Sequence, residues 1–95
     1  MKAYELLSDP SKWTTGVLAR NSDGKQVAPN NPSACQFCLV GALYHCYTPE
    51  KAMEIWIQLD SEFYNKDNEI GVGDWNDDPS RTHEEVVAFL KSKDL

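Results

Sequence analysis

The segment from Thr48 to Phe63 carries the clearest helix signal in the chain, and it sets the fold class more firmly than any other feature. Thr48-Pro49-Glu50 is typical of a helix start, because the fixed backbone of proline suits the first turn. Apolar residues then recur at spacings of three and four, which predicts one amphipathic helix. Its expected buried stripe is Ala52, Trp56, Leu59 and Phe63, widened by Met53 and Ile57.

The N-terminal half is predicted to hold a short helix around residues 4–7, a β-hairpin over residues 14–27 and a second helix. A polar Asn21-Ser22-Asp23-Gly24 turn indicates the hairpin. Asn30-Asn31-Pro32 predicts the start of a helix that runs to about Tyr47, with asparagine as its cap. One face of this helix consists almost wholly of small residues, which would let another element approach closely: Ala34, Cys38, Gly41, Ala42 and His45.

The last third of the chain is predicted to be a long loop followed by a final helix. Residues 65–79 are polar and outnumber a usual connection between helices, a property typical of functional loops. Thr82-His83-Glu84-Glu85 is a capping box, which predicts a helix that buries Val86, Phe89 and Leu90. The predicted fold class is therefore α+β and predominantly α, with about four helices and one β-hairpin in the N-terminal half.

Length and charge limit the classes of function. The chain has 95 residues, enough for one compact domain spanning residues 1–95. Its net charge of −6 is opposite in sign to a surface that neutralises phosphates, so we expect no direct binding to nucleic acid. No stretch resembles a secretory leader or approaches the roughly 20 apolar residues of a membrane span. Three cysteines, an odd number, fit a reducing compartment, so the expected location is the cytoplasm.

The negative charge belongs to the second half of the chain. Residues 1–47 carry three acidic and four basic side chains, whereas residues 48–95 carry twelve and five, a net charge of −7. Such a surface would steer a basic protein partner, most strongly at low salt. We predict Trp75, Asp77 and Asp78 as partner-binding residues, because a tryptophan between acidic residues suits an exposed anchor. The sequence does not determine the oligomeric state.

Cys38, His83 and Asn76 would supply the parts of a cysteine hydrolase: a thiol, a base and an orienting group, with Asp77 as the alternative to Asn76. In this interpretation Cys38 lies in the first two turns of its helix, where the helix dipole lowers the pKa of a thiol. The competing interpretation is that Cys38 is a small core residue within an apolar segment.

A zinc site is suggested by Cys35-x-x-Cys38 followed by His45-Cys46. On a continuous helix, however, Cys38 and His45 would lie about 10.5 Å apart along the axis, too far to share one ion. Only Cys35 and Cys38 could do so.

Residues 74–85 have the spacing of a calcium-binding loop. Carboxylate and amide side chains fall at its first, third, fifth and twelfth positions, on Asp74, Asn76, Asp78 and Glu85. Pro79 stands at the sixth position, where that loop takes a left-handed glycine that proline cannot replace. We therefore predict no metal and no cofactor, and a calcium-stabilised domain stays as a third interpretation.

Three stretches resemble a small bacterial and phage family of unknown function. They are an aromatic-Cys-x-x-Gly-Ala-Leu motif at residues 37–43, a Trp-Asn-Asp-x-Pro-x-x-Thr motif at residues 75–82, and residues 13–20. The family typically has tryptophan where this chain has Phe37. The resemblance implies no activity, but it implies that helix and loop form one unit. Residues 75–82 are therefore expected to pack on the Cys38–Ala42 face.

Three functions follow from these patterns. We expect a protein-binding or regulatory module that presents its acidic half to a basic protein, one special case being a phage-type inhibitor that mimics the charge of DNA. The alternative is a thiol hydrolase built on Cys38 and His83, and the third is the calcium-stabilised domain. The binding module is favoured because it needs no unusual geometry.

Overall fold

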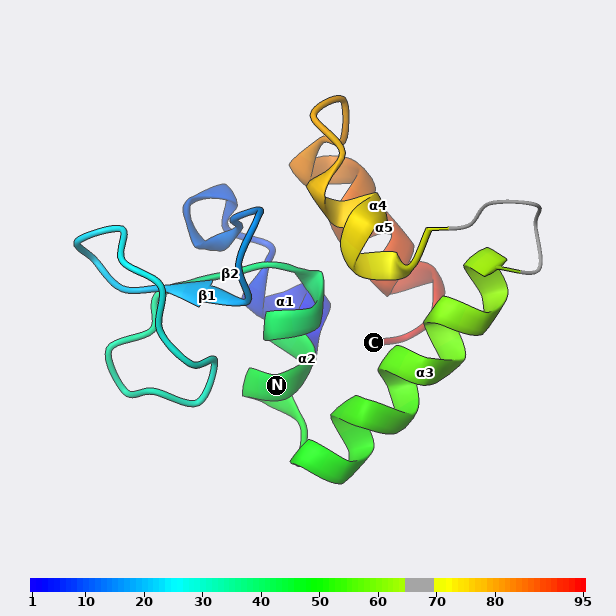
Figure 1. Ribbon diagram of the computed structural model, residues 1–95, viewed down its shortest axis with the longest axis horizontal. Helices are drawn as coiled ribbons and strands as arrows, with labels where there is room; N and C mark the ends of the chain where they lie inside the picture. The colour runs from blue at the N-terminus through cyan, green and yellow to red at the C-terminus, as the bar shows by residue number, and fades with distance from the viewer. Residues whose placement is uncertain (65–69) are drawn as a thin grey trace.

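The structure, a computed structural model, describes residues 1–64 and 70–95. These residues contain five α-helices and one small antiparallel sheet (Figure 1). The fold is α+β and predominantly α, as predicted. Among these residues, none of the helices combines the length and the apolar character that a membrane crossing requires. In chain order the elements are α1 (Ala3–Leu6), the 3₁₀ turn η1 (Pro10–Lys12), β1 (Ala19–Arg20), β2 (Gln36–Phe37), α2 (Leu39–Cys46), α3 (Pro49–Tyr64), α4 (Val72–Asp77) and α5 (His83–Ser92).

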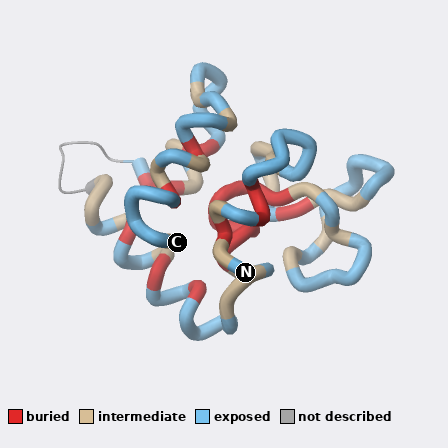
Figure 2. Tube along the Cα trace, turned by 180° about the vertical axis from the view of Figure 1, so that it is seen from behind, coloured by how far each residue is buried: buried red, intermediate tan, exposed pale blue. Residues whose placement is uncertain are grey.

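Helix α2 lies at the centre of the hydrophobic core. Its first five residues, 39–43, are all buried, so this half of the helix is enclosed on every side rather than amphipathic. Helices α1, α3 and α4 pack against it. Figure 2 shows the buried residues gathered at the middle of the molecule and the exposed ones on the outer loops. The large apolar side chains outside α2 that are fully buried are Leu7, Phe37, Leu59, Val72, Val86 and Leu90.

The predicted start of this helix near Pro32 is wrong, because the helix begins only at Leu39. The residues before it are taken up by strand pairing: Arg20 and Ala19 of β1 lie opposite Gln36 and Phe37 of β2. Asn31 accepts hydrogen bonds from the backbone and hydroxyl of Ser33 in a local turn instead of capping a helix. A long-range ladder has therefore overridden the local helix signal.

The predicted hairpin turn is present, but the second strand comes from elsewhere. Asn21 and Lys25 close the turn through a backbone hydrogen bond of 2.9 Å, and Gly24 adopts the positive φ of 79° that glycine tolerates best. A single bridge joins Arg20 to Gln26, whereas the regular partner of β1 is β2. The sheet is thus antiparallel and two-stranded as expected, with residues 21–35 between its strands.

Helix α3 has the predicted extent but not the predicted width of its buried stripe. Ala52, Ile55 and Leu59 are buried, whereas the side chains of Met53 and Ile57 are 53% and 62% exposed. The reason is that α3 lies at the edge of the molecule and packs on one side only (Figure 1). Met53 and Ile57 form an apolar edge that faces outward.

Helix α4 lies inside the segment predicted to be loop, of which residues 65–69 are outside the described part. The Asp60 carboxylate accepts a hydrogen bond of 2.7 Å from the backbone N–H of Val72, and the Asp74 carboxylate accepts one of 3.2 Å from Gly71. Both satisfy N–H groups at the helix start. A helix of six residues is too short to be stable by itself, so α4 depends on tertiary contacts, of which the bond to Asp60 of α3 is one.

Candidate functional site

Three sides of helix α4 face different parts of the molecule. Val72 and Asn76, one turn apart, are fully buried against the core. Gly73 and Asp77 line a groove beside α2, which we call the central groove. Trp75 faces away from that groove, toward α3 and α5. The predicted partner-binding residues Trp75 and Asp77 thus belong to different surfaces.

Asn76 is a buried hub of hydrogen bonds. Its Oδ1 accepts from the indole Nε1 of Trp13 at 2.8 Å and from the backbone N–H of Leu39 at 3.2 Å. Its Nδ2 donates to Asp77 Oδ1 at 2.9 Å and to the carbonyl of Thr14 at 3.4 Å. All four hydrogen-bonding positions of the amide are therefore occupied by the protein itself. Asn76 fastens α4 to the start of α2 and to the segment before β1.

The prediction that residues 75–82 pack on the Cys38–Ala42 face holds at one point, the contact of Asn76 with Leu39. The small residue Gly41 faces a different neighbour. A Cβ at Gly41 would lie 1.8 Å from the carbonyl oxygen of Leu18. The small-residue face of α2 thus accommodates the backbone that leads into β1.

Cys38 is the N-cap of α2, and its sulfur accepts a hydrogen bond of 3.3 Å from the Gly41 N–H. Burial nevertheless raises the pKa of this thiol, and the Asp77 carboxylate raises it further, while the amide N–H groups of Gly41 and Val40 oppose the change. The expectation of a lowered pKa is therefore wrong, because desolvation outweighs the helix terminus.

The three predicted catalytic residues have separate partners. His83 bonds through Nε2 to the carbonyl of Leu7, which requires a proton on that nitrogen, and its ring lies 6.2 Å from the ring of Trp13. Among the hydrogen bonds of the described residues, none joins Cys38 to His83 or Asn76 to His83. The thiol hydrolase stays a prediction, without an assembled group of base and thiol.

Thiol labelling distinguishes a core cysteine from a nucleophile. At pH 8 we expect iodoacetamide to modify Cys35 first, because it is exposed, whereas burial and a raised pKa leave Cys38 and Cys46 with less thiolate. Tandem mass spectrometry of the time course assigns each site, and the same reaction in urea is the control, in which all three should react alike. Labelling of native Cys38 at the rate of Cys35 would contradict the buried assignment and favour the hydrolase.

The acidic residues whose spacing resembles a calcium-binding loop have other structural roles. Asp74 caps the start of α4, and Asp78 Oδ1 accepts two hydrogen bonds from Ser80 that hold its pKa below the usual range. Glu85 accepts from the backbone N–H and hydroxyl of Thr82, which lower its pKa likewise. Within residues 1–64 and 70–95, no three His, Cys, Asp or Glu side chains come together as a metal site requires.

The central groove has a volume of about 300 Å³ and lies between the segment before β1, the start of α2, and helices α3 and α4. Its apolar lining includes Leu18, Val40 and Trp56, and its charged lining residue is Asp77. One oxygen of that carboxylate, Oδ1, accepts a hydrogen bond of 3.0 Å from the Gly16 N–H. Asp77 is thus fixed in position at the edge of the groove.

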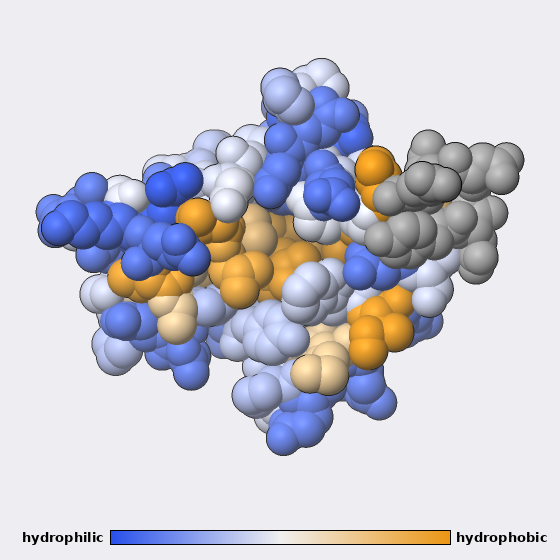
Figure 3. Space-filling view, viewed as in Figure 1, coloured by the Kyte–Doolittle hydropathy of each residue, from blue (hydrophilic) through white to orange (hydrophobic). Residues whose placement is uncertain are grey.

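A second hollow of about 330 Å³ continues this surface along α3, and we call its lining the α3 patch: Tyr44, Pro49, Glu50, Met53, Glu54 and Ile57. Tyr44 meets Trp56 edge to face, with ring centroids 6.1 Å apart, and so joins the patch to the central groove. Figure 3 shows apolar colour in the hollow at the centre of this face and again over α3, bordered by hydrophilic side chains. Sequence periodicity assigned Met53 and Ile57 to the interior, so their role in this surface was missed.

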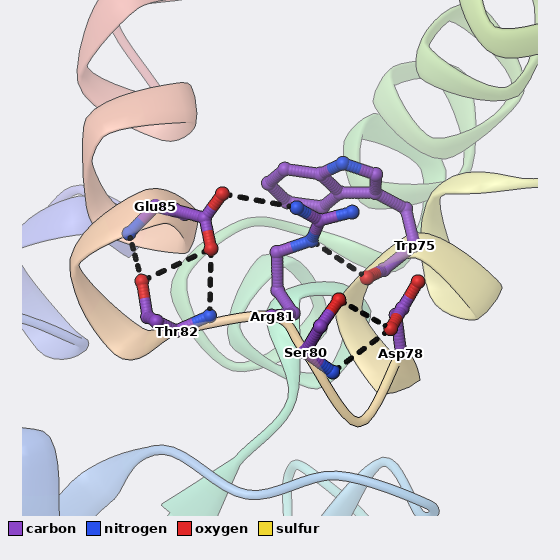
Figure 4. A network of polar contacts seen from close by, with 6 residues as sticks. All are labelled: Trp75, Asp78, Ser80, Arg81, Thr82 and Glu85. Atoms are coloured by element: carbon purple, nitrogen blue, oxygen red, sulfur yellow. Dashed lines mark hydrogen bonds and ion pairs between the residues drawn. The ribbon is translucent and has the colours of Figure 1, made fainter.

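Trp75 is half-buried in a cluster of rings rather than exposed as an anchor. Its ring centroid lies 5.8 Å from that of Phe63 and 5.1 Å from that of Phe89. The Arg81 guanidinium stacks on the indole at 4.1 Å, donates to the Trp75 carbonyl at 3.0 Å and pairs with Glu85 at 3.1 Å (Figure 4). These contacts fix the orientation of Trp75. Nothing in its sequence neighbourhood indicates Phe63 or Phe89 as neighbours.

Comparison with known proteins identifies a family for this chain but assigns it no activity. The model of a family described as a family of unknown function (DUF6197) matches residues 1–92. No curated protein matches the chain, and no solved structure does.

Proposed function

We propose that the chain, which belongs to the family of unknown function DUF6197, is a protein-binding module that docks a basic, partly apolar segment of a partner protein. Membership of this family supplies no activity. The proposed docking surface is the central groove together with the α3 patch. A regulatory protein or an inhibitor that occupies a basic surface of a host protein would be one form of such a module.

The observation that carries this proposal is the exposure of Met53 and Ile57 beside the central groove. Single exposed apolar side chains are common, but a contiguous apolar surface with a polar border is typical of a protein interface. Trp56 lines the groove and meets Tyr44, which lines the α3 patch, so two aromatic rings connect the two apolar areas. Tryptophan, tyrosine and methionine are also enriched at interfaces.

The negative charge around the proposed docking surface supports a basic partner. Asp77 borders the groove, and Glu50 and Glu54 border the α3 patch. Among the described residues that line the two hollows, lysine and arginine do not occur. The net charge of −7 over residues 48–95 would add longer-range attraction that falls with ionic strength. We place the protein in the cytoplasm, in keeping with three cysteines that are all free.

Binding of two designed helical peptides tests the proposal. One peptide has leucines spaced three and four residues apart, with lysine at the other positions, so that leucine forms one face of the helix. The other has glutamate in place of lysine. We expect the lysine peptide to bind at 50 mM salt, in fluorescence anisotropy, and to weaken strongly at 300 mM because charged contacts are screened. Met53→Gln with Ile57→Gln should weaken it about 10-fold or more without lowering stability, because both side chains are exposed.

A matched pair of charge reversals is the control. Glu50→Lys and Glu84→Lys both replace an exposed acidic residue in the first turn of a helix, but only Glu50 lies in the α3 patch. The first should weaken binding clearly more than the second. Equal binding of both peptides, or equal effects of the two reversals, would contradict the proposed surface.

A further inference from the structure

The second surface of α4 is a pocket of about 250 Å³ lined by Phe63, Trp75, Phe89, Glu62 and Lys93, which we call the aromatic pocket. We propose that it binds a quaternary ammonium group and that Lys93 is a built-in competitor for this site. The proposal does not depend on the docking surface, from which α4 separates the pocket.

The rings form a preorganised wall. The three centroids are 5.1–5.8 Å apart and the ring planes are tilted by 41–45°. Arg81 locks the indole of Trp75 through its backbone hydrogen bond and its pairing with Glu85. The negative faces of aromatic rings attract cations, and an aromatic surface of this kind suits methylated ammonium groups, as in the aromatic cages that bind choline and methyl-lysine.

The protein already places its own cations on these rings. The Arg81 guanidinium lies 4.1 Å from the Trp75 centroid, and the Lys93 ammonium lies 6.0 Å from the Phe89 centroid. Lys93, the residue that caps the C-terminal end of α5, also pairs with Glu62 of α3, and both line the pocket. The pocket therefore holds both features that recognise an organic cation: aromatic faces and a carboxylate.

Lys93 can leave the pocket at small cost. It follows the last residue of α5, and the side chains of Lys93 and Glu62 are 35% and 41% exposed. An exposed ion pair of this kind contributes little to stability, because solvent screens it and both long side chains lose freedom. A quaternary ammonium ligand would take the place of the Lys93 ammonium beside Glu62, while Lys93 turns to solvent. Removal of the Lys93 charge should then strengthen binding, which a purely structural ion pair would not predict.

Choline and its uncharged isostere 3,3-dimethylbutan-1-ol provide the test, because they differ in charge and hardly in shape. Binding is followed by the NMR signal of the Trp75 indole N–H, assigned with Trp75→Phe. We expect choline to shift this signal and the isostere to shift it far less. Lys93→Gln should tighten choline binding about threefold or more, whereas Lys91→Gln, a neighbour on α5 outside the pocket, should leave it unchanged.

Two further variants weaken the site by different means. Glu62→Gln removes the carboxylate, and Phe89→Leu removes a ring face while keeping an apolar side chain, so both should lower choline affinity. Thermal melts establish that each variant is folded. A peptide containing trimethyllysine, set against the same peptide with lysine, shows whether the group is carried by a modified side chain or by a small molecule. Equal shifts with choline and the isostere, or no binding even in Lys93→Gln, would overturn the proposal.

Discussion

Replacing Gly41 with alanine is expected to lower the free energy of unfolding by about 3 kcal/mol or more, the upper range for overpacking a core. The added Cβ would lie 1.8 Å from the Leu18 carbonyl oxygen and 2.8 Å from its carbonyl carbon. This backbone cannot retreat freely, because the same carbonyl accepts the hydrogen bond of 3.1 Å from the Cys38 N–H. The substitution thus separates the segment before β1 from α2. Urea denaturation followed by circular dichroism measures the loss.

The sign of this effect makes the test informative. In an ordinary helix interior, alanine is about 1 kcal/mol better than glycine. Gly73→Ala in α4 is the matched control, since nothing lies within 4 Å of a Cβ placed there. It should stabilise the protein by about 0.5–1 kcal/mol. A Gly41→Ala protein as stable as wild type would show that the segment before β1 does not sit against α2.

Asn76→Ala is expected to cost about 3 kcal/mol or more of unfolding free energy. It leaves two donors without their acceptor, the Trp13 indole N–H and the Leu39 backbone N–H. A buried donor without a partner costs about 1–3 kcal/mol. Asn76 is fully buried, so water is poorly placed to replace its amide. Chemical denaturation measures the loss of unfolding free energy. A loss below about 1 kcal/mol would contradict the role of Asn76 as a buried hub of hydrogen bonds.

Asn76→Asp distinguishes the acceptor role of the Asn76 amide from its donor role. It keeps an acceptor for Trp13 and Leu39 but turns the donor side into an oxygen facing Asp77 Oδ1 and the Thr14 carbonyl. Burial beside Asp77 would raise the pKa of the new carboxyl above its unfolded value of about 3.9. The deficit relative to wild type should thus be small well below about pH 4, where the carboxyl is protonated in both states, and grow as pH rises from the unfolded pKa to the folded pKa. Asn76→Ala should show no such pH dependence.

Local signals account for the elements that the sequence predicted well. The capping box of Thr82 and Glu85 forms as expected, and α3 begins at Pro49. Both depend on residues within one or two helical turns. The start of α2 and the whole of α4 depend instead on distant groups, such as Arg20 for the strand before α2 and Asp60 for the start of α4. No local pattern reports such partners.

The candidate sites divide in the same way. The sequence predicted Asp77 and Trp75 as partner-binding residues, with Trp75 as an exposed anchor. Both line hollows, but different ones, and Trp75 is half-buried. It assigned Met53 and Ile57 to the core, because helical periodicity shows which residues share a face but not whether another element covers that face. Glu62, Phe89 and Lys93 reach Trp75 only through the packing of α3, α4 and α5.

By itself, the sequence determined the fold class, the amphipathic helices and the acidity of the second half, since periodicity, capping and charge are carried by neighbouring residues. Tertiary structure decided which apolar side chains stay outside, and it made Cys38 a buried thiol of raised pKa rather than an activated one. It also joined Asn76 to Trp13 and Leu39 across the chain. The physical reason is that burial and hydrogen bonding at these positions depend on groups brought close only by folding.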